Sequence, residues 1–162
     1  MKYKAVIITI SDKGSCGQRV DTSGPALRDM LKDDFNVGDT IIIPDEADII
    51  ADTIRQQVDE LGIDLIVTNG GTGLSKRDVT PEATRMVIEK DLPGFAEVMR
   101  AESYKITPTA VISRAVCGIR KESIIINLPG SPKAATECLG FIKDALPHAL
   151  EKLKGSTADC AR

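Results

Sequence analysis

The stretch Leu65–Glu82, LIVTNGGTGLSKRDVTPE, joins a short apolar run to the start of a helix through a loop with three glycines. Leu65–Thr68 is rich in β-branched residues and has the continuity of a strand buried on both faces. Beyond the loop, Thr80 can act as the N-cap and Pro81 suits the first helical position. The stretch therefore predicts a buried strand, a long loop and a helix that begins at Pro81.

The same alternation of strand and helix continues along the chain. Three more apolar runs predict strands, at Ala5–Ile10, Thr40–Ile43 and Ser123–Leu128. Helical patterns fall at Pro25–Lys32, Ile49–Leu61, Phe95–Met99 and Ser131–Leu153, and Pro147 is expected to kink the last of these. Thr109–Ile119 fits either a strand or a helix. Alternating strands and helices predict an α/β fold, a three-layer α/β/α sandwich with a mostly parallel sheet.

Chain length and composition narrow the class of protein. With 162 residues we expect a single domain over residues 1–162, the last eight or so forming a tail. Since 24 acidic side chains outnumber 21 basic ones and only 3% of residues are aromatic, a nucleic-acid partner is not expected. No signal peptide or membrane span is expected either. The cysteines are too far apart for a CxxC pair and are typical of reduced thiols in a cytoplasmic protein.

Several kinds of active site are excluded by their missing motifs. The glycine loop lacks the Gly-Lys-Ser/Thr of a Walker A motif, and Lys76 stands where GxGxxG requires its last glycine. There is no GxSxG elbow and no zinc spacing. His148, the only histidine, falls in the last predicted helix, away from the glycine loop. Phosphoryl or nucleotidyl transfer remains, because it depends mainly on positioning and charge stabilisation.

Four loops follow the predicted strands and should meet at one edge of the sheet, where α/β proteins bind ligands. They are Ser11–Thr22, Pro44–Asp48, Asn69–Val79 and Pro129–Pro132. The third has 11 residues, more than the roughly 2 to 6 usual between strand and helix. Its glycines let backbone N–H groups approach a phosphate, although glycines needed only for a turn would give the same pattern.

Two acids in these loops suggest a metal ion. Asp78 would repel a phosphate unless a cation intervened, and Asp45 offers Mg²⁺ a second carboxylate. Each acid can instead cap a turn. Lys76 and Arg77 can be solvated or can neutralise a polyphosphate. Pro129, Gly130 and Ser131 precede a helix, where Ser131 can act as N-cap and an anion can bind.

The segment Asn69–Thr84, NGGTGLSKRDVTPEAT, resembles the signature of the Mog/MoaB family of molybdenum-cofactor biosynthesis proteins. Further blocks of the same family follow in the same order. They are Ile8–Asp12, Pro44–Glu46, Leu92–Phe95, Pro108–Arg114 and Asn127–Lys133, so that the resemblance covers nearly the whole chain.

The resemblance implies a molybdopterin-binding α/β/α fold, a homotrimer, and adenylylation of the molybdopterin phosphate with ATP and Mg²⁺. It implies that Asp45 and Asp78 are the catalytic and metal-binding acids, and that Ser113 lies beside the pterin. The implied substrate-binding set is Ser11, Asp12, Gly70, Gly71, Thr72, Gly73, Ser75, Arg77, Thr80, Glu82, Ser113, Pro129, Gly130 and Ser131.

The same family leaves a second function open. Its MoaB-type branch suggests a non-catalytic molybdopterin carrier, and the intact Arg77-Asp78-Val79-Thr80 favours the catalytic branch. A related domain of competence-associated nucleotide hydrolases ranks third, and a purely structural scaffold last. A molybdenum insertase is the implied recipient of the product.

Overall fold

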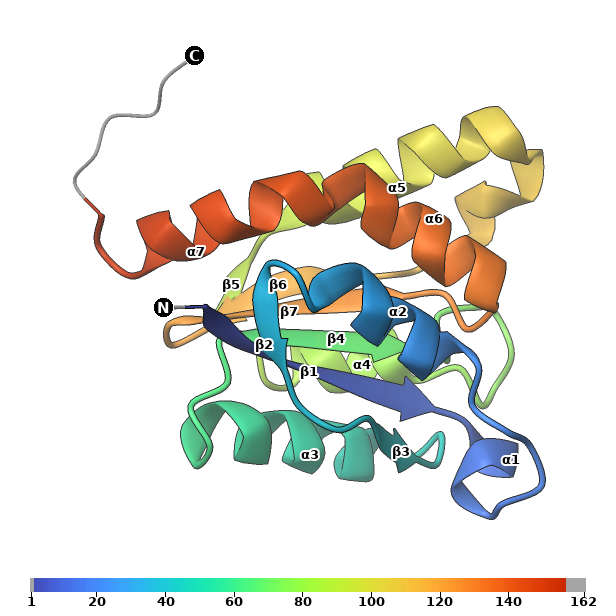
Figure 1. Ribbon diagram of the computed structural model, residues 1–162. Coiled ribbons are helices and arrows are strands. Elements are labelled where there is room, and N and C mark those ends of the chain that lie inside the picture. The colour runs from blue at the N-terminus through green and yellow to red at the C-terminus, as the bar shows by residue number, and fades with distance from the viewer. Residues whose placement is uncertain (1, 157–162) are drawn as a thin grey trace.

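The computed structural model describes residues 2–156. Helices cover both faces of one seven-stranded sheet (Figure 1). The strands are β1 Tyr3–Ile10, β2 Phe35–Val37, β3 Ile41–Ile43, β4 Leu65–Asn69, β5 Lys90–Asp91, β6 Cys117–Arg120 and β7 Ser123–Leu128. The helices are α1 Asp12–Ser15, α2 Ser23–Leu31, α3 Ala47–Asp59, α4 Thr80–Arg85, α5 Pro93–Ile106, α6 Pro132–Ile142 and α7 Leu146–Leu153, with 3₁₀ turns η1 Pro108–Ile112 and η2 Lys143–Ala145.

The sheet is mostly parallel, as predicted. Its order is β2-β1-β4-β7-β6-β5. The first part of β1 pairs with β2, and its last part pairs with β3. The contacts among β1, β2, β3, β4 and β7 are parallel, whereas β6 and β5 are added antiparallel. The chain adds β2 and β3 on one side of β1 and β4 on the other. The loops after β1 and β4 therefore diverge at a switch point, where open α/β sheets bind ligands.

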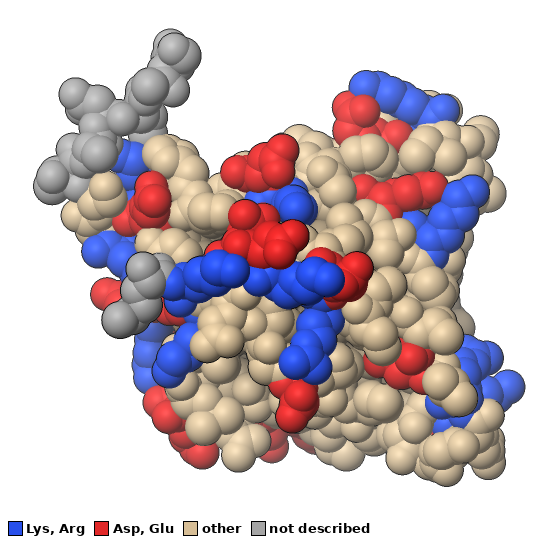
Figure 2. All heavy atoms as spheres, viewed as in Figure 1, with Lys and Arg blue, Asp and Glu red and all other residues tan. Residues whose placement is uncertain are grey.

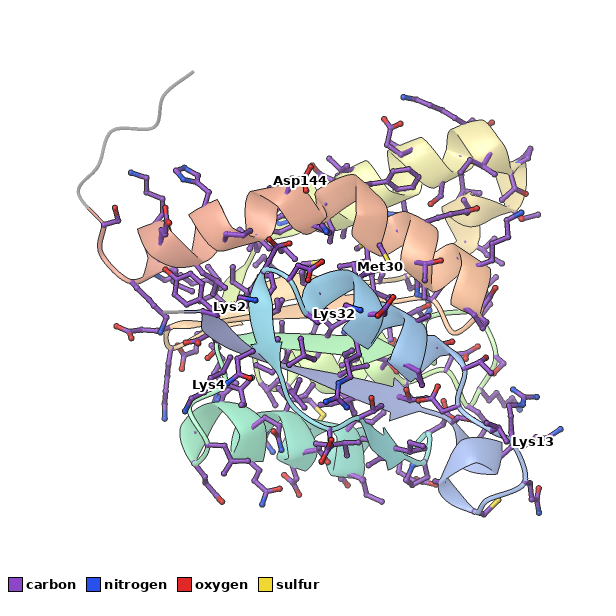
Figure 3. The ribbon with its side chains drawn as sticks, in the orientation of Figure 1. Lys2, Lys4, Lys13, Met30, Lys32 and Asp144 are labelled. Atoms are coloured by element: carbon purple, nitrogen blue, oxygen red, sulfur yellow. The ribbon has the colours of Figure 1, made fainter. Side chains whose placement is uncertain are left out.

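Successive strand residues point into two separate hydrophobic cores, one on each face of the sheet, and this arrangement forms the three-layer sandwich. Ala5 and Ile7 of β1 face the layer of α2, α5, α6 and α7, in which α2 packs on α6 beside Met30 (Figure 3). Val6 and Ile8 face the layer of α3 and α4. Side chains of a strand point alternately to opposite faces, so a fully apolar run such as Ala5–Ile8 is stable only when helices cover both.

Two short strands, β2 and β5, were not predicted from the sequence, and β6 begins in the segment that fitted either a strand or a helix. β2 and β5 have three and two residues, too few for a periodic signal. The ambiguous segment Thr109–Ile119 divides between η1, a stretch without regular structure at residues 113–116 and the first part of β6. β6 forms a hairpin with β7 in which Lys121 adopts a positive φ of 51°. Pairing with β7 and β5 makes this segment a strand, and its own residue pattern does not.

Two helix assignments need correction. Thr80 is not the N-cap of α4: it is the first helical residue, and its hydroxyl donates to the Gly70 carbonyl at 2.8 Å. The expected long helix Ser131–Leu153 is interrupted by η2. Pro147 lies in the first turn of α7 and lacks the N–H that would bond to Lys143, so the α-helical pattern breaks there. Ser131 does cap α6, because its side chain accepts from the Ala134 N–H.

The surface is mixed in charge. On the face shown in Figure 2, acidic and basic side chains are interspersed. No helix among the described residues is long and apolar enough to cross a membrane. The expected C-terminal tail lies outside the described residues, apart from Gly155 and Ser156.

An ion pair joins the end of α3 to the β6–β7 hairpin, at the start of β7 and so opposite the carboxyl ends of the parallel strands. Asp59 accepts from Arg120 at 3.0 and 2.6 Å, and Lys121 lies 2.9 Å away. These bonds lower the pKa of Asp59 from 3.8 to about 2. Because only 26% of the Asp59 side chain is exposed, the pair should stabilise the fold more than an ordinary surface pair.

We expect Asp59→Asn to lower the free energy of unfolding by about 1–2 kcal/mol near neutral pH. The carboxylate's stabilisation is fully present above the unfolded-state pKa of 3.8 and is lost as the pH falls through about 2. Urea unfolding between neutral pH and pH 2 measures this. Asp52→Asn, which removes an exposed pair with Arg55 on the same helix, should cost less than about 0.5 kcal/mol. An equal loss in both variants would contradict the prediction.

Candidate functional site

Two adjoining cavities open where the parallel strands end. Their volumes are about 430 and 380 Å³, and Gly71 and Gly130 line both. The loops after β1, β3, β4 and β7 all contribute, as expected for strands that point the same way. α1 stands beside the smaller cavity, and its Lys13 projects outward from the molecule (Figure 3).

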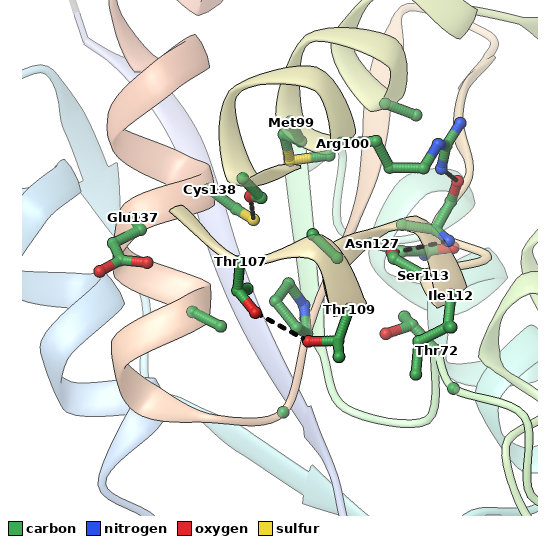
Figure 4. A pocket seen from close by; sticks show the side chains of 18 of the residues that line it. Thr72, Met99, Arg100, Thr107, Thr109, Ile112, Ser113, Asn127, Glu137 and Cys138 are labelled. Carbon is green, nitrogen blue, oxygen red and sulfur yellow. Dashed lines mark hydrogen bonds between the residues drawn. The ribbon is translucent and has the colours of Figure 1, made fainter. Parts of the chain in front are cut away.

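The larger cavity has a mainly apolar wall and a few polar groups (Figure 4). α5 and η1 supply Met99 and Ile112, and the glycine loop supplies Thr72. The polar groups are partly paired with each other: Ser103 Oγ lies 3.4 Å from Cys138 Sγ, and Thr107 Oγ1 lies 3.0 Å from Thr109 Oγ1. An apolar wall with a few placed polar groups is typical of a cavity that binds a small organic molecule.

The smaller cavity is more polar, and a buried chain of hydrogen bonds supports its wall. Asn69 Nδ2 donates to Thr9 Oγ1 at 3.0 Å, and Thr9 donates to Asp21 Oδ2 at 2.8 Å. Asp21 also accepts from the Gly24 N–H, and Ser23 donates to the Gly130 carbonyl at 3.0 Å. These bonds fix the loops around the cavity in one arrangement.

Gly70 and Gly71, in the loop after β4, stand where the backbone has a positive φ angle and where there is no room for a Cβ. Gly70 has φ +102°, and a Cβ there would lie 2.2 Å from the Ile10 carbonyl oxygen. Gly71 has φ +66°, and its Cβ would lie 2.3 Å from Thr80 Oγ1.

Among the described residues, the N–H groups of Gly71, Thr72 and Gly73 have no hydrogen-bond partner, whereas Gly70 donates to the Leu128 carbonyl. Three successive free N–H groups beside a cavity can bind an anion.

Asp12 and Asp45 hold each other across two loops. The Asp12 N–H donates to Asp45 Oδ2 at 2.9 Å, and the Asp45 N–H donates to Asp12 Oδ1 at 3.0 Å. Arg77 from the glycine loop binds both oxygens of Asp12 and also Glu46. Arg77 lowers the pKa of Asp12, whereas burial, and then the nearby charges of Asp12 and Asp78, raise the pKa of Asp45.

The carboxylates of Asp78, in the glycine loop, and of Asp45, in the loop after β3, both lie beside glycines of the loop. Asp78 Oδ2 accepts from the Ser75 N–H at 2.8 Å and would lie 2.9 Å from a Cβ on Gly73. Asp45 Oδ1 would lie 3.1 Å from a Cβ on Gly71. The described residues contain no group of three or more Asp, Glu, His or Cys side chains placed to hold a metal. Mg²⁺ needs only one or two carboxylates when phosphate and water complete its shell, so these two acids fit it.

The predicted site residues fall into two groups. Eleven line a cavity: Ser11, Asp45, Gly70, Gly71, Thr72, Gly73, Asp78, Ser113, Pro129, Gly130 and Ser131. The other five line neither cavity and hold the loops instead: Asp12, Ser75, Arg77, Thr80 and Glu82. Thr80 is fully buried, with its hydroxyl committed to Gly70.

Sequence reasoning missed two supporting residues. Arg114 binds the carbonyls of Gly73 and Asp78 and the carboxylate of Glu82. Buried Asn127 donates to Thr68 and Thr84 and accepts from the Val116 N–H. Both lie in quoted family blocks, but no spacing in the sequence links either one to its partners.

The fold and the paired cavities define an α/β domain with a more apolar and a more polar cavity side by side at the carboxyl ends of its parallel strands. The chain belongs to the family whose model is described as "Probable molybdopterin binding domain", which matches residues 6–148. Sheet, layers and site loops all lie within or next to that span.

Named relatives agree with this assignment. Molybdopterin adenylyltransferase of Helicobacter pylori J99 is 42% identical over 93% of this chain and 87% of its own length. The crystal structure of the molybdopterin biosynthesis enzyme MoaB of Thermus thermophilus is 46% identical, with a TM-score of 0.90 over 95% of this chain and 98% of that one. The tungsten cofactor synthesizing protein MoaB of Pyrococcus furiosus is 34% identical, with a TM-score of 0.87 over 94% and 98%.

Proposed function

We propose that this protein is a molybdopterin adenylyltransferase of molybdenum-cofactor biosynthesis. An oxygen of the molybdopterin phosphate attacks the α-phosphorus of ATP. The bond between that phosphorus and the oxygen that bridges to the β-phosphate breaks, and pyrophosphate leaves with this oxygen. The names of the relatives support the activity. A phosphate nucleophile is already ionised near neutral pH, so no catalytic base is needed, in keeping with a site in which histidine has no part.

The meeting of two unlike cavities at one glycine loop carries this proposal. A transfer between two substrates needs adjoining sites, and Gly71 and Gly130 line both cavities. We assign the pterin to the larger, more apolar cavity, beside Ser113, and ATP to the smaller polar one, beside Ser11 and Ser131. The phosphates then meet at the loop, where the free N–H groups of Gly71, Thr72 and Gly73 stabilise the charge on the α-phosphate of the adenylyl group in transfer.

We also propose that Asp45 and Asp78 bind Mg²⁺ between the two cavities. Asp78 lines the larger cavity and Asp45 the smaller one, so the two acids approach the junction from opposite sides. When bound, the ion supplies charge neutralisation for the phosphates. The chain's own contribution is to hold both carboxylates: the Asp12 N–H orients Asp45, and the Ser75 N–H orients Asp78.

We propose that the protein works in the cytoplasm as a homotrimer and delivers its product to a molybdenum insertase. Free thiols at Cys16, Cys117 and Cys138 support a reducing compartment. Exposed Val98, Tyr104 and Phe141 support an apolar contact with another chain. Light scattering should give three times the 17.4 kDa of one chain, and a monomer would contradict the trimer.

One assay separates the enzyme from the carrier. Purified protein is mixed with molybdopterin, ATP and MgCl₂, and adenylylated molybdopterin and pyrophosphate are followed by chromatography. Formation of both products in equal amounts, dependent on ATP, supports the transferase. Molybdopterin that stays tightly bound for hours without either product would instead support a carrier.

A further inference from the structure

Arg114 donates three hydrogen bonds to backbone carbonyls of the glycine loop. Its Nε donates to the Gly73 carbonyl at 2.8 Å, and its Nη2 donates to the Asp78 carbonyl at 2.7 Å. Its backbone N–H donates to the Thr72 carbonyl at 3.0 Å. One residue therefore holds the loop at Thr72 and Gly73 and again at Asp78, 36 to 42 positions away in sequence.

The guanidinium is itself held in place by Glu82. Both Glu82 oxygens accept from Arg114, and Glu82 stands in the first turn of α4, directly after the loop. The ion pair raises the pKa of Arg114 and lowers that of Glu82. A planar guanidinium presents several donors in fixed directions, so it can serve two carbonyls and a carboxylate together, whereas a lysine ammonium cannot match that geometry.

Arg114 also connects the loop to the wall of the larger cavity. Its neighbour Ser113 lines that cavity at the end of η1, which supplies Thr109, Ala110 and Ile112 to the same wall. A ligand in contact with η1 and Ser113 therefore touches the chain directly beside Arg114, the residue that binds the Asp78 carbonyl. Figure 4 shows Ser113 and Ile112 on the same side of the cavity as Thr72.

We propose that Arg114 is a positioning residue that sets the Asp78 carboxylate for transfer and couples it to occupation of the larger cavity. This proposal rests on the proposed adenylyl transfer. Arg114 lines neither cavity, so it acts through Asp78 and the loop rather than by touching a substrate. Glu82, expected from the family resemblance to bind substrate, becomes the partner that orients Arg114.

The test is Arg114→Lys, which keeps the charge and removes the fork of donors. We expect kcat to fall by about 10- to 100-fold while the KM for molybdopterin changes by less than about threefold, because the carboxylate is displaced and the pterin wall is kept. In the wild type, molybdopterin should tighten the binding of a non-hydrolysable ATP analogue with Mg²⁺ by about fivefold or more, and the variant should lose this coupling. Arg85→Lys, on the exposed side of α4, is the matched control and should keep the wild-type values.

A measurement without turnover keeps the two proposals separate. Hydrogen exchange of the amides in residues 72–78 should speed up at least about tenfold in Arg114→Lys and remain unchanged in Arg85→Lys. If Arg114→Lys does not fold, Glu82→Gln should give a smaller change in the same direction. Unchanged exchange, kcat and coupling in a folded variant would overturn the role of Arg114. A wild type without product, with faster loop exchange in the variant, would overturn the transferase and leave the role of Arg114 in holding the loop.

Discussion

Asp45→Asn is expected to lower kcat for adenylyl transfer by at least about 100-fold, because the uncharged amide binds Mg²⁺ weakly and neutralises none of its charge. The KM for molybdopterin should change by less than about threefold, since Asp45 lines the smaller cavity and the pterin is assigned to the larger one. Steady-state kinetics at saturating MgCl₂ measures both constants. Asp78→Asn should lower kcat by a similar factor, and because Asp78 lines the larger cavity its effect on the KM for molybdopterin is expected to be greater.

Folding should survive the Asp45 substitution. The asparagine oxygen can still accept from the Asp12 N–H, and removing a charge that lies near Asp12 and Asp78 relieves repulsion. The melting temperature should therefore be unchanged or slightly higher. Asp48→Asn, three positions along on the exposed side of α3, is the matched control and should retain kcat. Wild-type kcat in both Asp45→Asn and Asp78→Asn would rule out the two-acid metal site.

The second large effect is expected at Gly70. Gly70→Ala should lower the free energy of unfolding by about 2–4 kcal/mol, because an L-residue is strained at this backbone conformation and its Cβ meets a main-chain oxygen. The φ angle is +102°, and the Cβ would lie 2.2 Å from the Ile10 carbonyl oxygen. Chemical unfolding measures the loss, and turnover should fall with it because both cavities share the loop.

A matched alanine substitution shows whether the loop geometry is responsible. Gly94 stands in the first turn of α5, and a Cβ there would meet no atom within 4 Å. Gly94→Ala should therefore leave stability unchanged or raise it by up to about 1 kcal/mol. If Gly70→Ala cost no more than Gly94→Ala, the loop after β4 would be free to shift, and the close approach of Gly70 to Ile10 would not be needed.

Much of the sheet could be predicted because its signals are local. Ala5–Ile10 and Ser123–Leu128 form strands close to the expected bounds, since continuous β-branched runs favour buried parallel strands. β2 and β5 gave no signal, because two or three residues show no periodicity. β6 is a strand because it pairs with β7, a contact that no property of its own residues specifies.

The candidate site divides in the same way. The glycine loop, Asp45 and Asp78 were recognisable because each follows a strand and carries a residue type with a specific chemical use. The roles of Asp12, Arg77 and Glu82 were not, because what each residue contacts depends on loops from other strands. Asp12 pairs with Asp45, 33 positions away, and Arg114 reaches Gly73, 41 positions away.

Local sequence is enough to specify the alternation of strands and helices, the glycines of the loop after β4 and the supply of acids at strand ends. These features depend on side-chain branching, periodicity and backbone freedom, which act over a few residues. The folded chain was needed to show that the loops enclose two cavities, that Arg77 binds Asp12 and that Arg114 holds the glycine loop. Such contacts depend on the order and register of the strands, and the same buried runs would be satisfied by several orders.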